Sequence, residues 1–218
     1  MLYIVGTPIG NLSDISSRAL STLKESDYIL CEDTRRTKKL CHHFEIPTRL
    51  VSYHKFNEKS REEQILEDLK AEKKISLVSD AGMPTIADPG FTLIRKCHDE
   101  SLSVTCIPGP SAVITALCLS GLDTNAFQFL GFMPKKPGAI NRMITQAIEF
   151  KGTTIFFDTP HRLMKTLKFF PEDCKLVVIR EMTKIYEEIV RGTPGEISAH
   201  FAKKSVKGEF VILVEETL

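Results

Sequence analysis

Short apolar runs alternate with amphipathic segments over the first half of the chain, and this alternation restricts the fold more than any other feature. In the segments between the runs, apolar residues recur with helical spacing, most clearly over residues 57–73, where Ile65, Leu66 and Leu69 share one face. The apolar runs have strand length and lie at residues 2–5, 28–31, 50–53, 75–78 and 104–107. Because strands separated by helices pair in parallel, we predict a five-stranded parallel sheet covered by helices on both faces.

The pattern changes after Gly121. Only Met182 to Ile185 separate two of the later apolar runs, which is short enough for an antiparallel hairpin. The strands predicted in this half lie at residues 127–132, 153–158, 176–181, 186–191 and 209–215. We therefore predict an α/β protein of two α/β domains, with a parallel sheet in residues 1–118 and a mixed sheet in residues 119–218, joined near residues 119–125.

Composition excludes some classes of protein and leaves others open. With 218 residues and 42% hydrophobic content, the chain is large enough to bury the core of one large domain or of two small ones. Its net charge of +1 neither favours nor excludes an acidic partner, because nucleic-acid binding depends on local basic surface. The six cysteines form no C-x-x-C pair, so we expect no disulfide framework, no metal site and a reducing compartment. No apolar run is long enough to span a bilayer, and we expect a cytoplasmic protein without membrane contact.

Three turns rich in glycine, proline and small polar residues follow the first, fourth and fifth predicted strands. They lie at residues 6–10, 79–84 and 108–112. Because ligands of open parallel sheets bind at the carboxyl ends of the strands, these turns are expected to converge on one crevice. The chain contains neither G-x-x-x-x-G-K-S/T nor G-x-G-x-x-G, and the turns offer backbone groups, the Asp80 carboxylate and the Ser111 hydroxyl, but no cation. Such a lining suits a ligand that carries its own positive charge, such as a sulfonium.

Nine ordered motifs cover nearly the whole chain. They are GTPIGNL (6–12), CEDTRRT (31–37), SDAGMPTIADPG (79–90), IPGPSA (107–112), GFMP (131–134), PHR (160–162), REMTK (180–184), RG (191–192) and KGEFVILVE (207–215). Together they closely resemble the tetrapyrrole-methylase superfamily and, in it, the ribosomal RNA small-subunit methyltransferase I family. The resemblance implies a homodimer that binds S-adenosylmethionine between its two α/β domains and methylates the ribose 2′-oxygen of a cytidine in the decoding region of 16S ribosomal RNA. It also implies the 30S subunit or its RNA as partner.

The chain departs from the family pattern in two places. Phe157 and Asp158 stand where the family usually has tyrosine and glutamate. The chain also ends soon after Glu215, where many members continue into a basic helical segment.

The resemblance implies cofactor contacts along the three turns and the GFMP segment. Asp80 and Met83 are expected beside the sugar and methionine portions, and Pro8 near the transferred methyl group. The implied set is Pro8, Asp80, Ala81, Gly82, Met83, Pro108, Gly109, Ser111, Ala112, Gly131 and Phe132. The chemistry agrees, because a carboxylate can accept hydrogen bonds from a ribose or an ammonium group. Asp80 could instead cap a turn, and Gly82 and Gly109 could serve backbone geometry alone.

Methyl transfer to a ribose hydroxyl is helped by a nearby base. Three carboxylates at or just after the ends of predicted strands are candidate catalytic residues: Glu32, Asp33 and Glu181. Each could equally cap a helix or pair with Arg35 or Arg180.

Basic residues within or beside the motifs are candidate contacts to RNA phosphates. They are Arg35, Arg36, His161, Arg162, Arg180 and Lys184. Phe132, His161 and Tyr53 could stack on bases, although Phe132 and Tyr53 fit a core better. Two other functions remain open: a methyltransferase for a small molecule such as a porphyrinoid, which predicts few cations near the crevice, and a non-catalytic RNA-binding or assembly protein that retains the cofactor pocket.

Overall fold

A computed structural model describes residues 1–202 and 207–215 of the chain. The chain divides into two compact units, Met1–Ser111 and Ala112–Leu218. The expected domain limit, between residues 118 and 119, falls within helix α5 (Ala112–Ser120) and stays a prediction.

The first unit contains a five-stranded sheet in which every neighbouring pair is parallel. Its order is β3-β2-β4-β1-β5. The strands are β1 (Leu2–Val5), β2 (Tyr28–Cys31), β3 (Leu50–Ser52), β4 (Ile75–Leu77) and β5 (Val104–Ile107). The predicted parallel sheet is confirmed, with β3 and β4 each ending one residue earlier than predicted.

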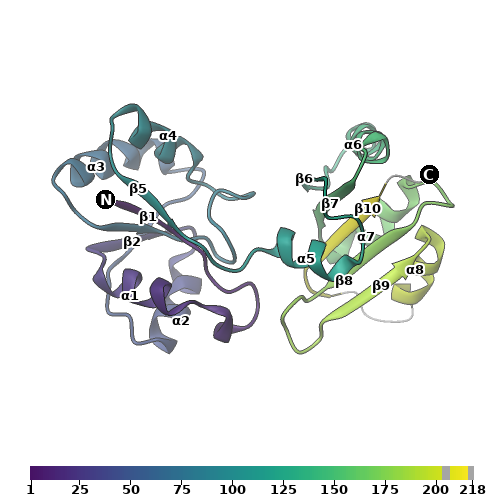
Figure 1. Ribbon diagram of the computed structural model, residues 1–218, viewed down its shortest axis with the longest axis horizontal. Coiled ribbons are helices and arrows are strands. Elements are labelled where there is room, and N and C mark those ends of the chain that lie inside the picture. Colours follow the sequence, from purple (N-terminus) through teal and green to yellow (C-terminus); the bar gives the residue numbers. More distant parts are fainter. Residues whose placement is uncertain (203–206, 216–218) are drawn as a thin grey trace. The chain divides into compact units, whose positions relative to one another are not determined.

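Helices cover both faces of this sheet, as predicted (Figure 1). They are α1 (Ser17–Glu25), α2 (Thr34–His43), α3 (Glu58–Lys70) and α4 (Phe91–Asp99), with a short 3-10 helix η1 (Leu12–Asp14). Because side chains alternate along a strand, Leu2 packs in the cluster with Leu66 of α3, whereas Val5 packs in the cluster with Leu23 of α1. The burial of both faces leaves the strand ends as the place where polar loops can gather.

The second unit contains a mixed sheet of order β6-β7-β10-β8-β9. Its strands are β6 (Phe127–Phe132), β7 (Thr153–Asp158), β8 (Leu176–Arg180), β9 (Glu188–Gly192) and β10 (Phe210–Glu215). Strands β6 and β7 are parallel and the other pairs are antiparallel, which confirms the mixed sheet and the β8–β9 hairpin.

Strand β9 begins two residues later than predicted, at Glu188. Glu181 and Thr183 adopt positive φ values of 51° and 64°, and the Thr183 N–H donates to Oε2 of Glu187 at 2.7 Å. These backbone angles and this hydrogen bond lengthen the turn between β8 and β9, so that β9 is shorter at its start than predicted.

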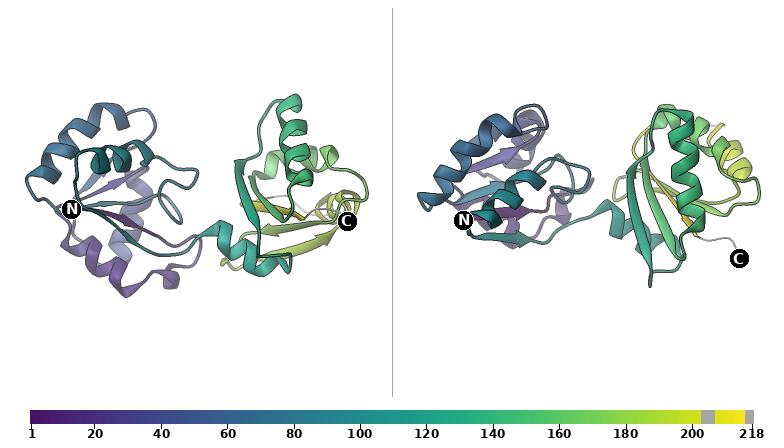
Figure 2. Two further views of the ribbon diagram at one scale, coloured as in Figure 1. Left: turned by 45° about the horizontal axis from the view of Figure 1, so that its top comes forward. Right: turned by 90° about the horizontal axis from the view of Figure 1, so that it is seen from above.

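Helices α6, α7 and α8 lie beside the sheet of the second unit (Figures 1 and 2). Their side chains contribute to one core. The helices here are α5, α6 (Pro137–Glu149), α7 (Pro160–Thr166) and α8 (Pro194–Ala202), with the 3-10 helix η2 (Leu167–Phe169). Ile144, Leu163 and Ile197 pack in one cluster with Phe156 of β7 and Ile212 of β10. Within the described ranges, no helix combines the length and apolar character needed to cross a membrane.

Candidate active site

The three glycine- and proline-rich turns of the first unit lie together at the carboxyl ends of adjacent strands β4, β1 and β5. Thr7 and Gly82 form an antiparallel bridge, in which the Thr7 N–H donates to the Gly82 carbonyl at 2.9 Å and the Gly82 N–H donates back at 3.0 Å. The Gly6 N–H donates to the Ile107 carbonyl at 3.1 Å. The predicted convergence of the turns is therefore confirmed.

Glycine is required where the first and third turns touch. A Cβ atom on Gly6 would lie 2.7 Å from Cα of Gly109 and 2.7 Å from Sδ of Met83. A Cβ atom on Gly109 would lie 2.9 Å from Cα of Gly6. Gly82 has a φ of +81°, which favours glycine. The packing of these backbones gives Gly6, Gly82 and Gly109 a structural role, whatever the turns bind.

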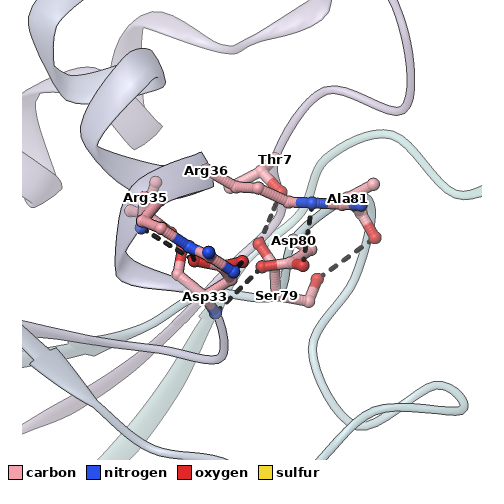
Figure 3. A network of polar contacts seen from close by, with 8 residues as sticks. Thr7, Asp33, Arg35, Arg36, Ser79, Asp80 and Ala81 are labelled. Atoms are coloured by element: carbon pink, nitrogen blue, oxygen red, sulfur yellow. Dashed lines mark hydrogen bonds and ion pairs between the residues drawn. The ribbon is translucent and has the colours of Figure 1, made fainter.

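Buried hydroxyl groups fix the turn after β4 (Figure 3). Oγ1 of Thr7 donates to the carbonyls of Ser79 and Gly82, both at 3.4 Å. Oγ of Ser79 donates to the Ala81 carbonyl at 3.2 Å. Thr7 and Ser79 are 2% and 4% exposed, so their hydroxyls hold the protein's own backbone rather than a ligand.

The remaining turn residues of the implied cofactor set differ in exposure. Ala81 and Pro108 are exposed, whereas Pro8 and Met83 are half-buried. Ser111 and Ala112 are half-buried and lie at the limit between the two compact units.

Asp80 connects the turn after β4 to the start of helix α2 (Figure 3). Its Oδ1 accepts the Asp33 N–H at 3.1 Å, and its Oδ2 lies 3.5 Å from Nε of Arg36. The turns themselves contain no cation, as the sequence indicates, but α2 supplies one. The side chain of Asp80 is 23% exposed and so is open to a further partner.

Asp33 is held by helix α2. As its N-cap, Asp33 accepts the Arg35 N–H at Oδ1 at 2.9 Å, and its Oδ2 lies 2.7 Å from Nη2 of Arg35. Hydrogen bonds from the side chain and backbone of Arg35 hold the pKa of Asp33 well below its usual range. Such a carboxylate is a weak proton acceptor.

Glu32 and Asp88 are in a different electrostatic situation. Burial raises the pKa of Glu32, and the nearby Asp80 carboxylate raises it further, while His54 and Arg36 oppose the shift. Burial, with repulsion from Glu32 and Asp80, raises the pKa of Asp88 to about 6. Sequence reasoning missed Asp88, although it lies inside the SDAGMPTIADPG motif. A carboxylate with a raised pKa is the better proton acceptor near neutral pH.

Glu181 belongs to the second unit and anchors the turn between β8 and β9. Its Oε1 accepts Nζ of Lys184 at 2.8 Å and the Glu209 N–H at 3.0 Å. Burial favours the neutral acid, but these two contacts outweigh it and lower the pKa of Glu181. Lys184 also pairs with the Glu209 carboxylate at 2.8 Å. Glu181 and Lys184, both predicted as site residues, therefore stabilise the turn between β8 and β9.

Arg162 and Arg180, the two predicted RNA contacts among the arginines of the second unit, are also paired with acidic side chains. Nη2 of Arg162 lies 3.0 Å from Oδ1 of Asp158, its Nη1 donates to the Met133 carbonyl at 2.6 Å, and its Nε donates to Oγ1 of Thr159 at 3.2 Å. Nε of Arg180 lies 3.2 Å from Oε2 of Glu188. His161, one residue before Arg162, is exposed.

The predicted aromatic platforms divide between surface and core. Tyr53 is 0% exposed and belongs to the first unit's core. Phe132 is 53% exposed, next to Gly131, whose φ is +77°, and its ring lies 5.3 Å from the ring of Phe157.

Within residues 1–202 and 207–215, no group of three His, Cys, Asp or Glu side chains could hold a metal ion.

Comparisons with known proteins place this chain in a family. Residues 1–198 match the family of Tetrapyrrole (Corrin/Porphyrin) Methylases. A protein of Halalkalibacterium halodurans called Ribosomal RNA small subunit methyltransferase I is 46% identical over 98% of this chain and 75% of its own length. Proteins of the same name from Bacillus subtilis and Thermotoga maritima are each 44% identical, with 75% and 97% of their lengths covered. The crystal structure of diphthine synthase matches 100% of this chain and 90% of its own with a TM-score of 0.77 at 16% identity, which shows a shared fold.

Proposed function

The chain belongs to the tetrapyrrole (corrin/porphyrin) methylases and to the family of ribosomal RNA small subunit methyltransferase I, and from this membership we propose that it methylates small-subunit ribosomal RNA with S-adenosylmethionine. The observation that carries the proposal is the 46% identity to such a relative over 98% of the chain. We propose further that the acceptor is the ribose 2′-oxygen of a cytidine in the decoding region, and that a cytoplasmic homodimer acts on the 30S subunit.

The cofactor is proposed to bind at the converged turns of the first unit. When bound, S-adenosylmethionine supplies a methyl group on a positively charged sulfur. The residues present fit this group, because the turns lie together, contain no cation and provide a partly exposed carboxylate at Asp80. The Asp80 carboxylate would accept hydrogen bonds from the ribose or the ammonium group. Gly131 and Phe132 remain proposed contacts, for which the exposed ring of Phe132 offers a flat apolar surface.

Positioning of the hydroxyl nucleophile would supply much of the rate, since well-oriented groups reach effective molarities of about 10⁵ to 10⁸ M. Among the three candidate bases we favour Glu32, because contacts with Arg35 and Lys184 lower the pKa values of Asp33 and Glu181. The pKa of Glu32 is raised, so its carboxylate would accept the 2′-hydroxyl proton more readily.

RNA is proposed to contact the exposed cations first. Arg35 and Arg36 have side chains 87% and 65% exposed, and His161 is exposed at the start of α7. Arg162, Arg180 and Lys184 stay in the proposed set, although each already has an acidic partner in its own unit. Arginines beside the turns favour a polyanionic substrate such as RNA over a small molecule with few negative charges.

The test compares three acceptors under one condition. The purified protein is incubated with tritiated S-adenosylmethionine and 30S subunits, naked 16S ribosomal RNA or a porphyrinogen. Label in subunits or in 16S RNA supports the proposal. Label in the porphyrinogen alone would instead identify a small-molecule methylase, and label in none would favour a non-catalytic RNA-binding protein.

The modified atom is tested separately. Labelled RNA is digested to nucleosides and analysed by mass spectrometry, with unmethylated subunits from a strain lacking the gene as substrate. We expect a cytidine with the added mass on its ribose. Added mass on a base would contradict the 2′-oxygen assignment while leaving RNA methylation standing.

A further inference from the structure

Two adjacent arginines at the start of helix α2 have different acidic partners (Figure 3). Nη2 of Arg35 lies 2.7 Å from Oδ2 of Asp33, which is the N-cap of the same helix. Nε of Arg36 lies 3.5 Å from Oδ2 of Asp80, which belongs to the turn after β4. Arg35 therefore serves its own helix, whereas Arg36 connects that helix to the proposed cofactor turn.

Asp80 lies in a region of negative charge. Glu32 and Asp88 are close enough to Asp80 that its carboxylate opposes the ionisation of both. Arg36 acts in the opposite direction, since its guanidinium pairs with Asp80 and favours the ionised form of Glu32. The field that a ligand meets at Asp80 therefore depends on where the Arg36 guanidinium lies.

The Arg36–Asp80 pair is weak enough to exchange. The Arg36 side chain is 65% exposed and its Nε is 3.5 Å from Asp80, and pairs of this exposure contribute little because water screens them. Asp80 does not depend on Arg36 for its position, because its Oδ1 accepts the Asp33 N–H. A phosphate near α2 could thus take the guanidinium from Asp80 without displacing the carboxylate.

We propose that Arg36 is an exchangeable counter-ion that couples RNA binding to cofactor recognition. An RNA phosphate attracts the Arg36 guanidinium, and Asp80 then presents a less neutralised carboxylate to the sulfonium cofactor. This inference rests on the proposed function and adds a regulation of that site. Because coupling between two ligands is reciprocal, the cationic cofactor also strengthens RNA binding.

The coupling discriminates between substrate and product. S-adenosylhomocysteine, the product of methyl transfer, has a neutral sulfur and gains less from an uncompensated Asp80. RNA binding should therefore raise the preference of the protein for S-adenosylmethionine over S-adenosylhomocysteine. From the energy of exposed ion pairs, the expected rise is about two- to fivefold.

Competition binding measures this preference directly. Tritiated S-adenosylmethionine is displaced by unlabelled S-adenosylhomocysteine in equilibrium dialysis, with and without saturating 30S subunits. In the unaltered protein, the preference should rise when subunits are added. In Arg36→Gln it should already be high without subunits and should not rise further. Arg36→Lys keeps the charge and should restore the response.

Arg35→Gln is the matched control, because it removes a neighbouring cation that pairs with Asp33 and not with Asp80. Arg35→Gln should weaken subunit binding and leave the rise in preference intact. Thermal unfolding of each variant shows that it is folded. The inference is overturned if Arg36→Gln responds like the unaltered protein, or if Arg35→Gln abolishes the response equally. If the unaltered protein binds no cofactor, the proposed function fails as well, whereas cofactor binding with an unchanged preference overturns the coupling alone.

Discussion

Asp88 is a half-buried carboxyl group that is costly to ionise. Burial and the charges of Glu32 and Asp80 raise its pKa to about 6, from 3.8 for an isolated side chain. A raised pKa means that the folded protein binds the proton more tightly than the unfolded chain. Stability from this group is therefore fully present below pH 3.8 and is lost as the pH rises through about 6.

Asp88→Asn should remove this pH dependence. At pH 8 the variant should be more stable than the unaltered protein by about 1–2 kcal/mol, and at pH 4 the two should differ little. Urea unfolding at the two pH values measures the difference. Glu32→Gln provides the control, because loss of its charge should lower the pKa of Asp88. The free energy of unfolding should then change less between pH 4 and pH 8. A constant difference at all pH values would show that Asp88 titrates normally.

Asp80 has a predicted role that single substitutions can separate from its structural one. Asp80→Ala removes both the acceptor for the Asp33 N–H and the partner of Arg36, and we expect no cofactor binding detectable by calorimetry. Asp80→Asn keeps an oxygen for the Asp33 N–H and should retain the fold with affinity reduced by about tenfold or more, since hydrogen bonds to charged groups contribute about 1.5–3 kcal/mol. Unaltered affinity in Asp80→Ala would place the pocket elsewhere.

At the level of single residues, the sequence predicted that Asp80 lies in a turn after β4, but not which side chains contact it. A carboxylate in a glycine-rich turn after a strand is a local pattern. Because the strands are predicted to be parallel, such a turn is expected at the edge of the sheet formed by their carboxyl ends. The contact of Asp80 with Arg36, and the raised pKa of Asp88, depend on side-chain directions and burial in the finished fold. No local pattern encodes those quantities.

Among the elements, the junction of β1 and β5 depends on two glycines in contact. Gly6→Ala places a methyl group 2.7 Å from Cα of Gly109, and the backbone must shift to admit it. We expect a loss of about 2–3 kcal/mol in the free energy of unfolding, together with weaker cofactor binding. Chemical denaturation measures the first effect.

Gly195→Ala is the matched control for this change. Gly195 lies in helix α8, and a Cβ atom there would have no neighbour within 4 Å. This variant should be stabilised by about 0.4–1 kcal/mol, because alanine restricts the unfolded chain more than glycine does. Equal losses in both variants would mean that the close approach of Gly6 and Gly109 is not the cause.

A buried carboxylate joins helices α3 and α4. Glu62 is 1% exposed, its Oε2 lies 2.6 Å from Nζ of Lys96, and Tyr53 and Thr92 donate hydroxyl hydrogens to its Oε1. Burial raises the pKa of Glu62, but the hydrogen bonds from Lys96 and Thr92 lower it by more. With a lowered pKa, its contribution to stability is present above pH 4.5 and is lost as the pH falls through the folded value.

Glu62→Gln should therefore lower stability at pH 7 by about 1–3 kcal/mol, and the deficit should shrink below pH 4.5. Urea unfolding across this pH range measures it. The neighbouring Glu63 is exposed on the same helix, and Glu63→Gln should stay within about 0.5 kcal/mol of the unaltered protein. A deficit that is independent of pH would show that the carboxylate of Glu62 carries no special stabilisation.

Element positions followed closely from the sequence because each depends on a short pattern. The predicted ranges of β1, β2, β5, β6 and β7 match the structure. The predicted start of β9 does not match the structure, because the turn before it is longer than predicted. Glu181 and Thr183 in this turn adopt positive φ values, which are rare for residues other than glycine. The order of strands in the sheets could not be predicted from local patterns either. Strand β10, for example, pairs with β7 and β8, which are distant from it in the sequence.

At the scale of the whole molecule, a net charge of +1 requires that RNA binding arise from a local set of cations. Many of the candidate cations already have acidic partners, which reduces the number available to phosphates. Arg162 is the clearest case, because its guanidinium contacts Asp158, Thr159 and the Met133 carbonyl. Arg35 and Arg36 are the more exposed pair.

The salt dependence of binding distinguishes these two kinds of arginine. Each phosphate contact to single-stranded RNA contributes a slope of about −0.7 to the logarithm of affinity against the logarithm of salt concentration. Arg35→Gln and Arg36→Gln should each make the slope less negative by about 0.7, as measured by filter binding of 16S ribosomal RNA. Arg162→Gln should change the slope by clearly less than 0.7, because Arg162 must give up contacts within the second unit to reach a phosphate, and it should lower thermal stability. If Arg162→Gln alters the slope as Arg35→Gln does, then its guanidinium leaves Asp158 when RNA binds, and the number of phosphate contacts is larger than the exposed cations indicate.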